Sequence, residues 1–145
     1  MSSIRVIDGK ILVVGGSICI NDDCCCGETI CELDTGNDLD VYFEGITNSE
    51  GEGCSQFCES TFNGKTFQLT WDAGNNWWSY VSGDIAITAQ CISGSYIRVV
   101  AVYDQFFCFY ALTTPVDLPQ EVNNEDVYNG SCDPITGTAT VSIHV

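Results

Sequence analysis

Cysteine is the residue type in this chain with the most distinctive chemistry. The sequence holds ten cysteines, an even number, and three of them are consecutive. Consecutive cysteines do not pair comfortably with one another, so a disulfide framework would take these three to separate partners. The candidates for disulfides or metal ligands are Cys19, Cys24, Cys25, Cys26, Cys31, Cys54, Cys58, Cys91, Cys108 and Cys132.

The same thiols allow two other states. A structural Zn²⁺ could use Cys24, Cys26, Cys54 and Cys58, but the spacing Cys54-x₃-Cys58 lacks the usual partner knuckle. Free buried thiols are the remaining alternative. Disulfides are favoured, although the opening residues do not resemble a signal peptide and so weigh against the ordinary oxidising route.

Carboxylates offer a second kind of site. Asp34, Asp38 and Asp40 lie in the segment DTGNDLD and could supply hard oxygen ligands to Ca²⁺. The segment does not match an EF-hand loop, and solvated surface carboxylates are the favoured interpretation. We therefore expect no cofactor, with structural zinc or calcium as the alternatives that are not favoured.

Catalytic residues are scarce. The one histidine, His144, is the penultimate residue, and any Ser-His-Asp triad or Cys-His dyad would have to include it. No Cys-x-x-Cys pair is present for redox catalysis. The expectation is that this protein is not an enzyme.

Aromatic residues could form a binding surface. Trp77, Trp78 and Tyr80 lie close together, and exposed aromatics on a β-sandwich are a common sugar-binding platform. Adjacent residues of a strand point to opposite faces, so one tryptophan is expected in the core and the other outside. A core or subunit-interface role is favoured over binding of a glycan.

The composition excludes some partners. The chain has 145 residues, 45% of them hydrophobic, and a formal net charge of −16 with only four basic residues. A nucleic-acid surface needs clustered Lys and Arg, so nucleic acid is not an expected partner. Insertion into a membrane is not expected either, because no apolar run approaches about 20 residues.

The elements that must position these residues are β-strands. Short runs of β-branched and aromatic residues recur between turn residues, without a long helical period. Near the N-terminus, Asp8-Gly9 and Gly15-Gly16 separate three such runs and predict a three-stranded meander over residues 1–20. It is too small to bury both of its faces, so it is expected to be an assembly arm that docks through Ile4, Val6, Ile11, Val13 and Ile18.

The rest of the chain divides into two parts. Residues 21–38 are rich in cysteine and acidic residues and are expected to form a connector. Residues 39–145 contain seven strand-like runs with turns about every ten residues, which predicts an all-β body. The expected body is an antiparallel, jelly-roll-like β-sandwich.

Several sequence segments together resemble a known group of proteins. These are GKILVVGGSI followed by DDCCC, LDVYFEGIT, the Cys-x₃-Cys before FNGKTFQLTW, and NGSCDP followed by a strand. They resemble small Cys-rich proteins of tailed phages, prophages and some marine bacteria. The resemblance implies a structural or surface component without enzymatic activity.

These observations lead to one leading hypothesis and two alternatives. The chain is expected to be an acidic, disulfide-rich virion subunit, such as a decoration, tail or fibre protein. It would form homo-oligomers by strand exchange of its arm and contact other virion proteins. The alternatives are a carbohydrate-binding or adhesive surface module and a subunit of a cellular extracellular filament. The expected location is the virion or the extracellular space, without a recognisable signal peptide.

Overall fold

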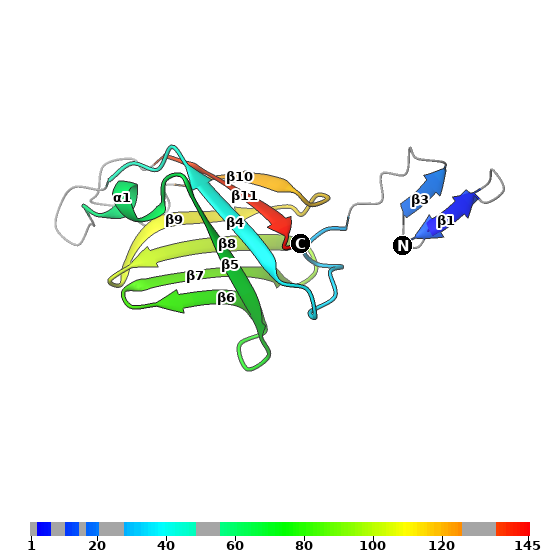
Figure 1. Cartoon of the computed structure of the whole chain (residues 1–145), viewed down its shortest axis with the longest axis horizontal. Coiled ribbons are helices and arrows are strands. Elements are labelled where there is room, and N and C mark those ends of the chain that lie inside the picture. The colour runs from blue at the N-terminus through cyan, green and yellow to red at the C-terminus, as the bar shows by residue number, and fades with distance from the viewer. Residues whose placement is uncertain (1–2, 7–10, 15–16, 21–27, 49–55, 126–135) are drawn as a thin grey trace.

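The protein consists almost entirely of β-strands. The computed structural model describes residues 3–6, 11–14, 17–20, 28–48, 56–125 and 136–145, and for the first three segments it describes the backbone alone. Within these residues the chain forms a three-stranded sheet, an eight-stranded sheet and one short helix (Figure 1). No helix in the described residues is long and apolar enough to cross a bilayer.

The small sheet occupies the runs expected near the N-terminus. Its antiparallel strands are β1 (Ser3–Val6), β2 (Ile11–Val14) and β3 (Ser17–Ile20), in that order. The pairing brings Val13 opposite Ile18, and Ile11 opposite both Val6 and Ile20. These strands pair with one another and with no strand of the larger sheet.

The large sheet is an antiparallel meander that nearly closes on itself. Its order is β10-β11-β4-β5-β6-β7-β8-β9. Strands β4 to β9 follow the order of the chain, and the last two strands, β10 and β11, join the other edge through the β11–β4 pair. The strands are β4 (Leu39–Glu44), β5 (Lys65–Asp72), β6 (Trp77–Ser82), β7 (Ile85–Ile92), β8 (Tyr96–Tyr103), β9 (Phe106–Thr113), β10 (Gln120–Asn123) and β11 (Thr138–Ile143). The result is one barrel-like sheet.

The seam between β9 and β10 is closed by residues that follow β10. The backbone N–H of Glu125 donates to the carbonyl of Tyr110 at 2.7 Å. The Asn124 side chain accepts from the N–H of Tyr110 at 2.8 Å and donates to the carbonyl of Cys108 at 3.0 Å. The side-chain amide of Asn124 therefore replaces a regular strand ladder at this position and provides hydrogen-bond partners for backbone groups at the edge of β9.

A two-sheet sandwich with jelly-roll connections is not confirmed. The eight strands of the body form a single sheet whose connections are all between neighbours, with β9 and β10 meeting at the seam. Two elements were also missed by the sequence pattern. The seven strand-like runs expected in the body include neither strand β10 nor helix α1 (Cys58–Phe62), because both segments are rich in polar residues.

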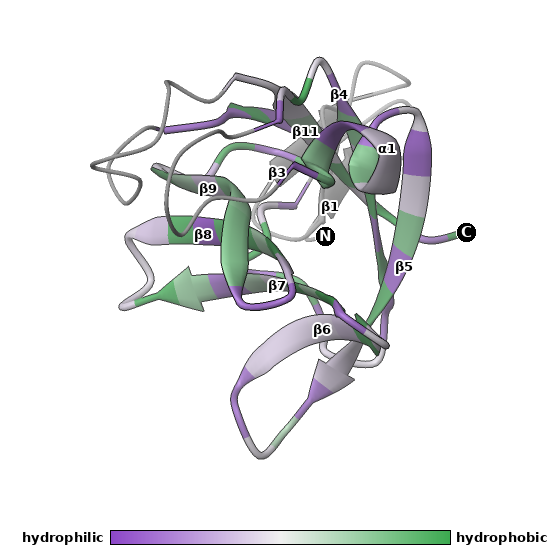
Figure 2. Ribbon diagram, turned by 90° about the vertical axis from the view of Figure 1, so that its left-hand side faces the viewer, coloured by the Kyte–Doolittle hydropathy of each residue, from purple (hydrophilic) through white to green (hydrophobic). Residues whose placement is uncertain are grey.

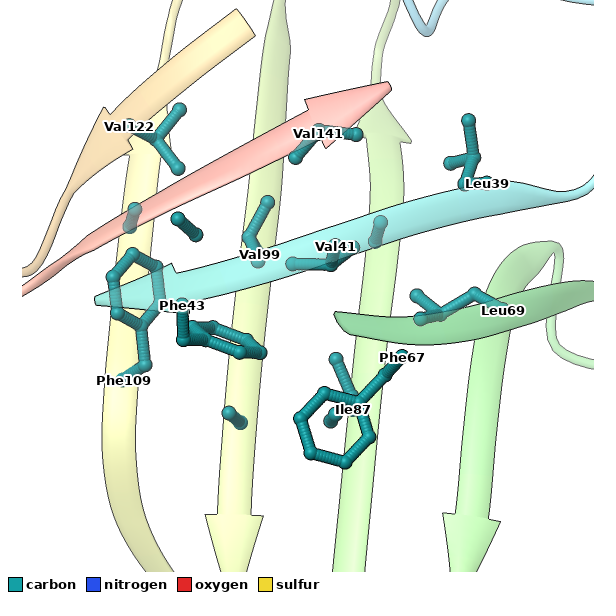
Figure 3. Packing of buried hydrophobic residues seen from close by; sticks show 14 of the residues in the cluster. Leu39, Val41, Phe43, Phe67, Leu69, Ile87, Val99, Phe109, Val122 and Val141 are labelled. Carbon is teal, nitrogen blue, oxygen red and sulfur yellow. The ribbon is translucent and has the colours of Figure 1, made fainter. Parts of the chain in front are cut away.

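Alternating apolar residues fill the inside of this sheet. In β4, Leu39, Val41 and Phe43 are fully buried while the residues between them are at least partly exposed. Figure 3 shows that side chains from strands on opposite sides of the barrel interior meet around Phe43 and Phe109. Fully buried residues from other strands include Leu69, Ile87, Ile97, Val99, Ala139 and Val141.

Both ends of the sheet are covered by chain segments. At one end, Phe62 of α1 is fully buried and its ring lies 5.4 Å from that of Phe43. At the other end, Ile30 and Leu33, which precede β4, join the same core. Side chains therefore fill the interior along its length. A binding site is expected on the outer surface instead.

Candidate functional site

An apolar hollow lies on the outer face of β6 to β9, on the side away from the core. Its volume is about 530 Å³, within the roughly 300–1,000 Å³ typical of ligand sites. In β8, Val100 and Val102 line it, whereas their neighbours Val99 and Ala101 are fully buried in the core. Figure 2 shows that hydrophobic residues extend along β7, β8 and β9. In β8 and β9, apolar side chains thus lie on both faces of the sheet.

The register of the four strands arranges the lining in cross-strand rows. One row consists of Ser79, Thr88, Val100 and Tyr110, and the next consists of Val81, Ala86, Val102 and Phe107. Val81, the penultimate residue of β6, retains 72% of its surface exposed, which is a large value for a valine within a strand. The second row is therefore an apolar strip on the outer face of the sheet.

A bulge in β9 supplies part of this lining. Ala101 pairs with Phe109 and Val102 pairs with Phe107, which leaves Cys108 as an extra residue. A regular strand would place Phe107 and Phe109 on the same face. The bulge instead turns Phe107 outward into the hollow while Phe109 stays fully buried.

Arg98 is a cation within this lining. Its Nη2 donates to Oε1 of Gln90 at 2.7 Å, and Nε2 of Gln90 donates to the carbonyl of Asn76 at 3.2 Å. Gln90 and Arg98 are direct cross-strand partners. This relay orients the guanidinium, whose further N–H groups could serve a partner placed in the hollow.

Asp72 provides a negative charge near Trp77. The Asn75 side-chain amide donates to Oδ2 of Asp72 at 2.7 Å, and this bond is the main cause that lowers the pKa of Asp72. Burial opposes it, while the backbone N–H groups of Asn75 and Gly74 act in the same direction. Asp72 is therefore ionised at neutral pH.

The three aromatic candidates occupy different environments. Trp77 is half-buried and lines the hollow. Trp78 is 2% exposed, and its indole N–H donates to the carbonyl of Asn37 at 2.8 Å. Tyr80 packs on Phe67 with ring centroids 5.2 Å apart. Of the three, Trp77 is the one placed to meet a ligand on the outer face.

Among the residues whose side chains the structure describes, four cysteines form two disulfides, one at each end of the large sheet. Cys31 is bonded to Cys91, and Cys58 of α1 is bonded to Cys108 of β9. Cys19 lies in β3, where the backbone alone is described. Cys24, Cys25, Cys26, Cys54 and Cys132 lie outside the described residues. The first bond attaches the connector to the body, and the second attaches the segment after β4.

The proposed calcium ligands have separate partners. Asp34 accepts from the N–H of Gly36 at 2.9 Å, and Asp38 accepts from the Gln68 side chain at 2.7 Å. Asp40 lies 2.9 Å from Nδ1 of His144 across the β4–β11 pair. Within residues 28–48, 56–125 and 136–145, no three His, Cys, Asp or Glu side chains gather as a metal site requires.

The hollow itself was not found from the sequence. The sequence places Arg98, Val100, Val102, Phe107 and Tyr110 in strand-like runs without marking them as a site. A usable signal was present, because residues 97–103 are apolar at nearly every position, which is typical of a strand covered on both faces. Alternation between faces then places half of these residues outside the core.

Comparison of the chain with family models, curated proteins and solved structures found no match. What the protein does must therefore be inferred from its own residues and geometry.

Proposed function

We propose that this protein is a non-enzymatic structural subunit of a repeating assembly, and that it is a phage virion component such as a decoration, tail or fibre protein. The observation that carries the proposal is the separate apolar sheet of β1 to β3, which pairs with none of the other eight strands. An isolated sheet of this size cannot bury its own faces, so it needs another surface to be stable. Exchange of such an element between copies is an economical route to an assembly.

Two further features support this proposal. The described disulfides join residues 60 and 50 positions apart, which suits a particle that persists in oxidising surroundings, such as a virion or an extracellular structure. The body also exposes an apolar hollow that a neighbouring subunit could cover. Packing of the small sheet on a neighbour would form a two-layer contact between copies.

Deletion of residues 1–20 tests the proposal. The eight strands, α1 and both described disulfides lie outside this segment, so the truncated chain should remain soluble and folded. We expect it to lose assembly completely, because the arm that links the copies is gone. Sedimentation velocity measures assembly, and far-UV circular dichroism provides the control for folding. Assembly of the truncated chain at the level of the full chain would show that the proposal is wrong.

A carbohydrate-binding or adhesive module is the second candidate, and Trp77 is the observation that favours it. Its ring lines the hollow together with Asp72 and Asn75, a combination of aromatic and polar groups suited to a sugar ring. On this alternative, Trp77→Ala should reduce retention on a responsive glycan array by about tenfold or more. Tyr96→Ala is the matched control, since Tyr96 is 47% exposed and is not among the lining residues. Equal retention of Trp77→Ala and the unchanged protein would exclude glycan binding through Trp77.

A cellular extracellular filament would use the same arm and the same body. It differs from the virion proposal in the source of the assembly. Locating the protein in purified virions or in cell-surface filaments distinguishes the two.

A further inference from the structure

We propose that the outer face of β6 to β9 is the docking seat for the β1–β3 sheet of a second copy of this chain. The inference deepens the proposed assembly function and rests on it. The two surfaces would pack face to face, as two layers of a sandwich do.

The dimensions of the two surfaces agree. With strands about 4.8 Å apart and a rise of about 3.3 Å per residue, the small sheet measures about 10 by 13 Å. On the same spacings, β6 to β9 span about 14 Å, and the lining from Trp77 to Val81 extends about 13 Å along the strands. The small sheet is therefore no wider or longer than the lined area on which it would pack.

Both surfaces present apolar residue types. In the small sheet, the register brings Val6, Ile11 and Ile20 into one cross-strand row, and Ser3, Val13 and Ile18 into the next row on the same side. The hollow presents the strip of Val81, Ala86, Val102 and Phe107. Burial of such surfaces is favourable at roughly 25 cal/mol per Å² of apolar area.

The charges of the two parts are opposite. In residues 1–20, Arg5 and Lys10 outnumber the single acidic residue Asp8, whereas the rest of the chain holds only Lys65 and Arg98 against all the other acidic residues. The arm is thus the positively charged part of a chain whose net charge is −16. Attraction to an acidic body favours docking and speeds the encounter.

Acidic residues also border the hollow at both ends. Asp72 lies near Trp77 at one end. At the other end, the N–H of Asp104 donates to the carbonyl of Asp84 at 2.9 Å, so the β6–β7 and β8–β9 turns lie side by side. Asp84 and Asp104 are both exposed. Arg98, which is also part of the lining, is held by Gln90 on the neighbouring strand. A basic arm would therefore meet carboxylates at the two ends of its seat.

The test compares full-length variants that place a charge in the seat or in the arm. Val81→Glu and Val100→Glu alter the seat; Val81 is so exposed that its change removes little from the core. Val13→Glu alters the arm, and Thr66→Glu adds the same charge to an exposed position of β5 outside the hollow. We expect self-association, measured by sedimentation velocity, to weaken by about tenfold or more in the seat and arm variants. Thr66→Glu should associate like the unchanged chain.

Mixing two defective variants tests the direction of the contact. Val81→Glu keeps an intact arm, and Val13→Glu keeps an intact seat, so an equimolar mixture should form one-to-one complexes and nothing larger. Native mass spectrometry reads this stoichiometry. If Val81→Glu and Val100→Glu assemble as well as the unchanged chain while Val13→Glu does not, the seat is wrong and the assembly function stands. If the unchanged chain stays monomeric, the assembly function fails and this inference fails with it.

Discussion

Replacing Cys58 and Cys108 together by alanine should lower the free energy of unfolding by about 4 kcal/mol. The bond joins residues 50 positions apart, so its removal releases a long loop in the unfolded chain. Both cysteines are also fully buried, and their replacement removes packed sulfur atoms from the core. Urea unfolding of the oxidised proteins measures the loss, which is large beside the 5–15 kcal/mol typical of a folded domain.

The Cys31–Cys91 bond provides the matched comparison. Its sequence separation is 60, so the chain-entropy contribution should be almost the same, about 4 kcal/mol. Cys31 and Cys91 are only partly buried, and their double replacement by alanine should therefore destabilise the protein less than the first pair does. A loss below about 1 kcal/mol for Cys58 and Cys108 would contradict a structural role for that bond.

Phe43→Ala should lower the free energy of unfolding by about 3–5 kcal/mol. Phe43 is fully buried, and its ring contacts three other rings. The centroid distances are 5.4 Å to Phe62, 6.0 Å to Phe67 and 5.4 Å to Phe109. Alanine would leave a cavity between β4, β5, β9 and α1, and it would remove three edge-on ring contacts. Figure 3 shows Phe43 beside Phe67 and Phe109. Urea unfolding measures this loss.

Phe43→Leu is the control for this substitution. Leucine fills much of the same volume, so the cost should fall to about 1–2 kcal/mol. An unchanged slope of the unfolding curve would show that the denatured states are comparable. If alanine costs no more than leucine at this position, the ring cluster is not the centre of the core.

The strands could be predicted where local residue patterns determine them. Leu39, Val41 and Phe43 alternate with polar residues, and the structure buries these three. Strand β10 was missed because its short run, QEVN, has little β-forming character of its own. It exists through pairing with β11, a contact between residues distant in the sequence.

The closure of the sheet depends on interactions that no sequence pattern displays. Asn124 lies in a polar segment, NNED, that carries no strand pattern, yet its side chain bridges the seam to Tyr110 and Cys108. The bulge at Cys108 likewise changes which face Phe107 occupies. Both features arise from tertiary register, so alternation alone predicts a strand there and misplaces its faces.

The residues of the candidate site likewise divide into one that its residue type identifies and others that only the sheet order brings together. Trp77 was identified from its residue type and lies in the hollow. The remaining lining was missed because valine and alanine on the outer face of a strand look like core residues until the sheet order is known. Arg98 acquires significance only beside Gln90 on the neighbouring strand.

Native mass measurement of the full chain, combined with negative-stain imaging with and without reductant, tests the central claim most directly. We expect the oxidised protein to form regular particles or fibres well above the 15.7 kDa of one chain. Loss of these on reduction would assign the cysteines a role in the assembly. A monomer under both conditions, at concentrations where a stable assembly would form, would contradict the account.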